Sequence, residues 1–158
     1  MLAVVRIAAL GAVLASMLSA SSAMAAEKAP PTADQVVARH AELVRNLEVR
    51  SGEALARAGE TGVNAVNALD AKGAADEKIL AAGRRALGRV GMGVDRSLGG
   101  VRKVTEGALR TLTRIGASDE VKQSVRATAS GAAASIRASG EAAATAIRSA
   151  VDAATANE

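Results

Sequence analysis

This chain has no cysteine, phenylalanine, tyrosine or tryptophan, and its 158 residues include one histidine and two prolines. Without cysteine the protein can form no disulfide and carries no thiol for redox chemistry. A structural zinc site takes several histidine or cysteine ligands, so the single histidine cannot supply one. Aromatic side chains provide the platforms on which single-stranded nucleic acid stacks, and their absence argues against nucleic acid as a partner.

The residues available for a core are small. After residue 25 the chain has 27 valine, leucine, isoleucine or methionine residues and 32 alanines. Alanine buries little area but has the lowest cost of any residue in a helix. The composition therefore predicts helices around a thin core, marginally stable alone or stabilised by a partner.

The first 25 residues read as a secretory signal peptide. Arg6 precedes an apolar run over residues 7–18, and Ala23-Met24-Ala25 fits the small-residue cleavage rule. The run is shorter than the ~20 residues that span a bilayer. We expect cleavage after residue 25 and export to a bacterial periplasm; release to the extracellular space, or an uncleaved inner-membrane anchor, is the alternative. Residues 26–32 contain both prolines and predict an extended linker.

Apolar residues three apart recur about every eleven positions. The pairs are Val44/Leu47, Leu55/Ala58, Val66/Leu69, Leu87/Val90, Leu98/Val101 and Leu109/Leu112, and single apolar residues follow at Val125, Ile136 and Ile147. Eleven residues in three turns give 3.67 per turn, close to the 3.6 of an α-helix. Such a stripe stays on one side of a helix for its whole length. No run alternates at period two, so we predict no sheet.

Breaks in the pattern divide residues 33–158, taken as a single helical region, into helices at about 33–69, 76–115 and 119–154. Thr32 or Asp34 can cap the first, and Gly116 and Ser118 mark the clearest break, between the second and the third. The predicted fold is all-α, with two to four long amphipathic alanine-rich helices. Three helices fit the breaks best, in an antiparallel bundle or coiled-coil-like arrangement that is partly disordered when free.

The middle segment has the longest apolar stripe. It comprises Leu87, Val90, Val94, Leu98, Val101, Leu109, Leu112 and Ile115. Residues 87, 94, 101, 108 and 115 also lie seven apart, so a heptad seam is an alternative to the eleven-residue stripe. Seven of the fourteen glycines after residue 25 fall between Gly83 and Gly107. Each costs about 1 kcal/mol in a helix, and no two are four apart, so we expect them to loosen the helix rather than to pack it closely.

Charge is also concentrated in the middle. Residues 71–116 have ten basic and four acidic residues, a net charge of +6, against −2 for residues 33–70 (four basic, six acidic). On a helical wheel six cations form one ridge opposite the leucines: Arg85, Arg89, Arg96, Lys103, Arg110 and Arg114. Such a ridge predicts contact with anionic lipid or a cell-envelope polymer. The alternative is a solvated face that pairs with acidic helices.

No constellation of residues predicts catalysis. His40 lies on the apolar stripe, where a core histidine is the simplest interpretation. The acidic pairs Asp76-Glu77 and Asp119-Glu120 stand where helices start and complement the helix dipole. We therefore predict that the protein is not an enzyme and holds no cofactor or metal.

Segments such as Val104-Thr105-Glu106-Gly107 and residues 125–129 resemble the eleven-residue repeats of group 3 late-embryogenesis-abundant proteins, synucleins and exchangeable apolipoproteins. The resemblance lies in period and composition over about residues 33–155. It implies helices that form on lipid or on drying, with roles in lipid binding or desiccation protection. The chain departs from those families in using arginine more than lysine.

Three functions follow as hypotheses. The first is a structural or interaction protein that associates with itself or a helical partner through its Ala/Leu/Val stripes. The second is a reversible binder of anionic membrane or envelope surfaces through the basic middle helix. The third is a stress protectant that folds on drying.

Overall fold

A computed structural model describes residues 30–156 and places three α-helices in them, without any strand. The helices are α2 (Ala33–Asp70), α3 (Asp76–Arg114) and α4 (Asp119–Thr155). The predicted all-α class and the number of helices are confirmed, and each observed boundary lies within one residue of the expected one. The predicted signal peptide lies outside the described residues. Of the predicted linker only residues 30–32 are described, and they are not helical.

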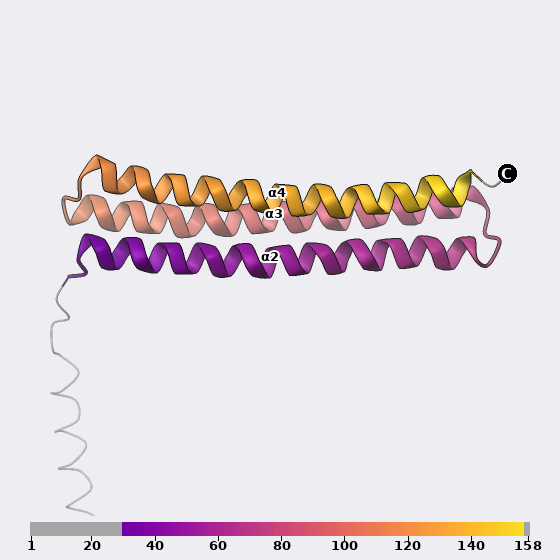
Figure 1. Ribbon diagram of the computed structural model, residues 1–158, viewed down its shortest axis with the longest axis horizontal. Coiled ribbons are helices and arrows are strands. Elements are labelled where there is room, and N and C mark those ends of the chain that lie inside the picture. Colours follow the sequence, from indigo (N-terminus) through magenta and orange to yellow (C-terminus); the bar gives the residue numbers. More distant parts are fainter. Residues whose placement is uncertain (1–29, 157–158) are drawn as a thin grey trace, which may run out of the picture. The chain divides into compact units, whose positions relative to one another are not determined.

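Each helix of residues 31–158 packs against both of the others, which makes a three-helix bundle (Figure 1). His40 near the start of α2 bonds to Thr105 near the end of α3, which shows that the two helices run antiparallel. Near the other end of the same two helices, Gly62 lies against Ala86. α4 then returns alongside α2, and Gly62 also touches Ile147 of α4.

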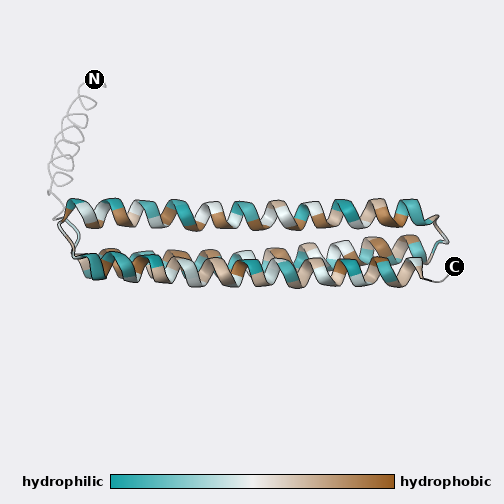
Figure 2. Ribbon diagram, turned by 90° about the horizontal axis from the view of Figure 1, so that it is seen from above, coloured by the Kyte–Doolittle hydropathy of each residue, from teal (hydrophilic) through white to brown (hydrophobic). Residues whose placement is uncertain are grey.

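Buried residues recur every eleven positions on all three helices. The rows are His40/Ser51/Gly62 and Val44/Leu55/Val66 on α2, Ile79/Val90/Val101/Leu112 on α3, and Val125/Ile136/Ile147 with Ala132/Ala143/Ala154 on α4. An eleven-residue period departs little from the natural helical twist. Nearly straight helices of 37 to 39 residues can therefore keep each row facing the bundle axis along their whole length. In Figure 2 the hydrophobic colour of α3 lies mainly along its edge toward the other two helices.

The two members of each apolar pair take different positions. In α2 the first member is buried, as at Leu55, and the second is half-buried, as at Ala58. In α3 the order is reversed, since Val90 is buried and Leu87 half-buried. The half-buried member lies toward α3 in α2, as Leu47 does, and toward α4 in α3, as Leu87 does. On a heptad seam Leu87 would have been as central as Val101, and it is not.

The expectation that glycine only loosens the helices is wrong at four positions. Gly59, Gly62, Gly83 and Gly140 are buried where another helix comes close. A Cβ on Gly62 would lie 2.7 Å from the Cβ of Ala86, and one on Gly140 would collide with Val94. Glycine here allows close approach between helices even without a four-residue spacing. Gly88 has no such role, because a Cβ there would meet nothing within 4 Å.

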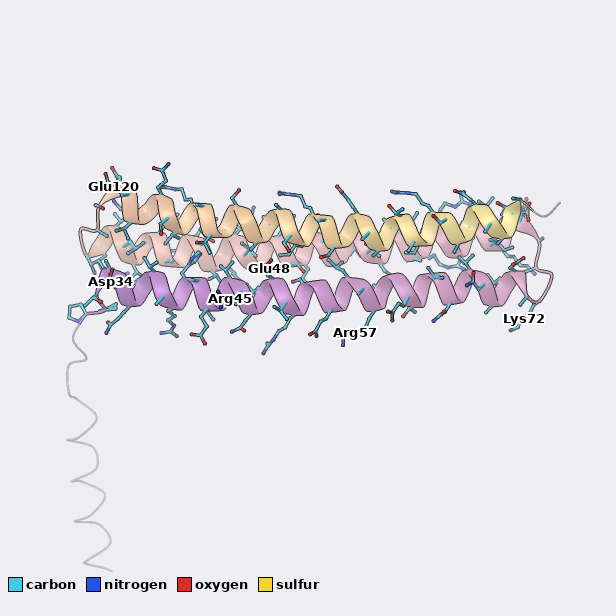
Figure 3. The ribbon with its side chains drawn as sticks, in the orientation of Figure 1. Asp34, Arg45, Glu48, Arg57, Lys72 and Glu120 are labelled. Atoms are coloured by element: carbon cyan, nitrogen blue, oxygen red, sulfur yellow. The ribbon has the colours of Figure 1, made fainter. Side chains whose placement is uncertain are left out.

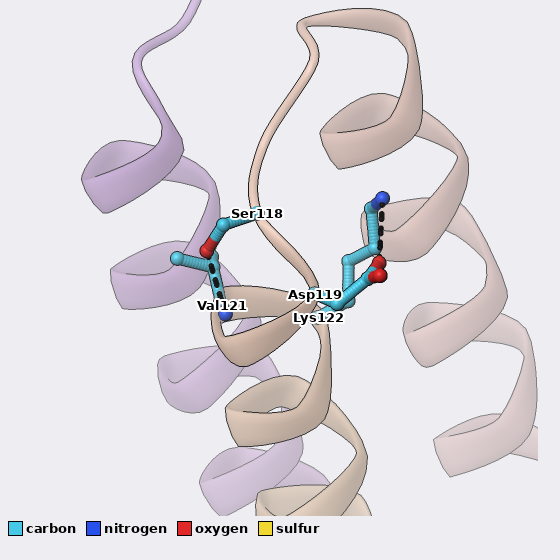
Figure 4. A network of polar contacts seen from close by, with 4 residues as sticks. All are labelled: Ser118, Asp119, Val121 and Lys122. Carbon is cyan, nitrogen blue, oxygen red and sulfur yellow. Dashed lines mark hydrogen bonds and ion pairs between the residues drawn. The ribbon is translucent and has the colours of Figure 1, made fainter.

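Capping side chains begin α2 and α4, and a glycine makes the turn between α3 and α4. Thr32 and Gln35 form a reciprocal capping box at the start of α2. At the start of α4, the Ser118 hydroxyl accepts a bond from the Val121 amide, and Lys122 pairs with Asp119 (Figure 4). Gly116, with φ of 70°, makes the turn before α4.

Candidate functional site

The six cations of the predicted ridge all lie on the outside of α3. All six side chains are exposed: Arg85, Arg89, Arg96, Lys103, Arg110 and Arg114. At about 100° per residue they occupy an arc of roughly 60° on the helix. Among the described residues none of the six forms an ion pair. Their charges are therefore available to an external partner.

α2 adds basic residues beside this ridge. Leu47 marks the flank of α2 that packs on α3, since a Cβ at Gly100 would lie 3.6 Å from it. At about 100° per residue, the charged side chains next to Leu47 on its solvent side are all basic. They are Arg39, Arg50 and Arg57, all of them exposed. We call these three and the six of α3 the cationic face.

The contribution of α2 is not apparent from the sequence, because residues 33–70 carry a net negative charge. The acidic residues of α2 lie elsewhere on the helix, either outermost, as Glu42 and Glu60 do, or toward α4, as Glu48 does, by the same periodicity. The signal that could have found the arginines is their spacing: Arg39 and Arg50 are eleven apart, in step with the apolar rows.

Ion pairs within the described residues all join residues of the same helix. They are Glu53–Arg57 at 3.8 Å, Arg102–Glu106 at 3.9 Å and Asp119–Lys122 at 3.2 Å. Figure 3 shows Arg57 projecting outward from α2, and Glu120 doing so from the start of α4. Exposed pairs of this kind contribute about 0–1 kcal/mol, so charge pairing does little to hold the bundle together.

The predicted apolar stripe of α3 is split in two by the packing. Val90, Val101 and Leu112 are buried, whereas the other five members are half-buried: Leu87, Val94, Leu98, Leu109 and Ile115. The stripe omitted Ile79, Ala82 and Ala86, which the structure buries. Ile79 continues the row of Val90 eleven residues earlier. The two alanines lie in the core because helices approach closely there.

A shallow groove runs between α3 and α4 outside the core. Its larger section, of about 560 Å³, is lined by Leu98, Ala129 and Ala133 among others. A second section, of about 340 Å³, continues it past Leu87 and Ala144. The groove is open because α4 presents small side chains where α3 presents leucines.

His40 is a core residue with one polar partner. Its side chain is 2% exposed, and its Nε2 lies 3.1 Å from the Thr105 hydroxyl oxygen. That hydroxyl donates its only proton to the carbonyl of Val101, so Nε2 of His40 is the donor to Thr105. Nδ1 is buried, and no residue in the described part of the chain bonds to it. Burial lowers the pKa of His40, because a protonated Nδ1 would be unbonded and out of water.

The described residues contain no group of three or more histidine or acidic side chains placed to hold a metal ion. None of the helices in that part of the chain is long and apolar enough to cross a membrane. Comparison with protein-family models, with curated proteins and with solved structures gave no match to this chain. The cationic face and the groove are therefore the two surface features that bear on function.

Proposed function

We propose that this is an exported, non-enzymatic interaction protein whose bundle binds an anionic membrane surface through the cationic face. One observation carries the proposal: the six cations of α3 are exposed, share one arc and form no ion pair among the described residues. From Arg85 to Arg114 the row extends over about 44 Å at 1.5 Å per residue. A rigid row of that length can meet many headgroups at once.

The binding would be electrostatic and peripheral. The bundle buries its best apolar residues, such as Leu55 and Ile136, inside. The cationic face offers Met92, 63% exposed, as a large apolar side chain but no aromatic residue to anchor in the lipid. Each basic residue near an anionic leaflet contributes on the order of 1 kcal/mol, and salt screens that attraction. The proposal thus implies reversible binding that weakens as ionic strength rises.

Vesicle cosedimentation tests the proposal. A fragment of residues 31–158 contains the whole described core and forms one compact unit. We expect it to sediment with phosphatidylglycerol vesicles at low salt, to be released at high salt, and to ignore phosphatidylcholine vesicles. The triple variant Arg85→Gln, Arg96→Gln, Lys103→Gln should lose roughly 100-fold in partitioning, since three charges contribute about 3 kcal/mol.

The chain offers a matched control with the same loss of charge. Arg126→Gln, Arg137→Gln, Arg148→Gln removes three cations from α4, outside the cationic face, and should change partitioning much less. Equal effects of the two triple variants, or equal binding to both kinds of vesicle, would refute the proposal. Circular dichroism of the same samples addresses the protectant hypothesis, which requires that helices appear only when water is removed.

A further inference from the structure

α3 carries a second apolar row that the bundle buries only in part. This leucine row occupies an arc of roughly 40° at about 100° per residue and comprises Leu80, Leu87, Leu98 and Leu109. Leu80 is 43% exposed and the other three are half-buried. By contrast, the core row of the same helix is buried from Ile79 to Leu112. The leucine row runs along the α3 side of the α3/α4 groove, where Leu87 and Leu98 line the two sections.

The two rims of this groove have different charges. The α3 rim carries Asp95 and Glu106, eleven apart, and also Arg102, which pairs with Glu106. The α4 rim carries three arginines, also eleven apart, and one carboxylate: Arg126, Arg137, Arg148 and Glu141. Among the described residues no ion pair crosses the groove. Counting these lining residues, the α3 rim has two carboxylates and one arginine, whereas the α4 rim has three arginines and one carboxylate.

We infer that the groove is where a second copy of this chain docks, so that α3 and α4 of two copies form a four-helix core. In a two-fold dimer each surface meets the same surface of the other copy, so the surface must be complementary to itself. The α3/α4 surface meets this condition, because the leucine row of each copy can fill the groove of the other beside the small side chains of α4. Asp95 and Glu106 on the α3 rim of each copy then lie along the arginine row of the other α4. Since both rows repeat every eleven residues, successive charges match in register.

This dimer leaves the cationic face free. The cationic face lies on the α2 side of α3, whereas the leucine row lies on the α4 side. Dimerisation is therefore independent of membrane binding, and a failure of either would not imply a failure of the other.

Sedimentation equilibrium of the 31–158 fragment, from low micromolar to near-millimolar concentration, tests the inference. We expect a monomer–dimer equilibrium that Leu98→Glu shifts to monomer. Met92→Glu places the same charge on the other side of α3 and should leave the equilibrium unchanged. A fragment that stays monomeric throughout, or one that dissociates equally with both substitutions, would overturn the inference.

Charge exchange provides a test that does not touch the core. The pair Asp95→Arg, Glu106→Arg should weaken association by roughly tenfold or more, and so should the pair Arg126→Glu, Arg137→Glu. Combined in one chain, the four substitutions should restore association to near the original constant. All four residues are exposed, so helicity should be unchanged. Additive weakening in the combined variant would contradict the proposed arrangement.

Discussion

At the scale of single residues, this bundle depends on side chains that are small or absent. Gly62 is buried where a Cβ would lie 2.7 Å from Ala86 of α3 and 2.9 Å from Ile147 of α4. The same glycine costs about 1 kcal/mol of helix propensity, but it lets the three helices come close together at this position. Gly88 has the same unfavourable helix propensity, but no other helix lies within 4 Å of where its Cβ would be.

The first prediction compares these two glycines. Gly62→Ala should lower the free energy of unfolding by on the order of 1 kcal/mol, because overpacking costs about 1–3 kcal/mol and the gain in helix propensity returns about 1 kcal/mol. Gly88→Ala should raise it by up to about 1 kcal/mol. Urea denaturation of both variants measures the difference. Stabilisation by both substitutions would show that the helices do not approach as closely as described.

The second prediction concerns His40 and pH. The folded state holds the pKa of His40 below its ordinary value, so below pH ~6.5 the unfolded chain binds more protons than the folded one. Stability should therefore fall as the pH decreases from about 7.5 to 5.5, with a slope of at most about 1.4 kcal/mol per pH unit for one proton. Thermal melts across this range measure it. His40→Gln should flatten the profile, and an unchanged slope would exclude His40 as the cause.

At the scale of the elements, the helices are long because the eleven-residue rows hold them straight, and they end because particular residues stop them. Ser118 is exposed, and its hydroxyl accepts a hydrogen bond from the amide of Val121 and so begins α4. The left-handed backbone of Gly116 turns the chain just before it. The boundaries were readable from the sequence because capping is local chemistry.

The third prediction tests this cap. Ser118→Ala should lower the free energy of unfolding by about 1 kcal/mol, since the Val121 amide loses its partner. Ser149 is exposed within α4 and caps no helix. Ser149→Ala makes the same chemical change there and should leave the free energy of unfolding unchanged or raise it slightly. Chemical denaturation of the two variants side by side separates capping from propensity. Equal effects would count against a role for Ser118 in starting the helix.

At the scale of the whole molecule, the stripes that predicted association mostly meet one another inside a single chain. Val66, Ile79 and Ala154, from three different helices, share one cluster, and Leu55, Val90 and Ile136 share another. The apolar surface left outside the core includes the leucine row along the α3/α4 groove, and the charged surface includes the cationic face. Whether the free chain is partly disordered stays a prediction, which the circular dichroism of the vesicle experiment also measures.

The sequence by itself determined the helical class, the number of helices and their ends, because period, propensity and capping act within a few residues. It also determined which cations of α3 share one side, since that depends only on the helical twist. The tertiary structure alone decided which member of each apolar pair is buried, which glycines mediate close packing, and that Arg39 and Arg50 border the ridge of α3. Those outcomes depend on which flank of each helix meets a neighbour, and residues far apart in the chain decide that together.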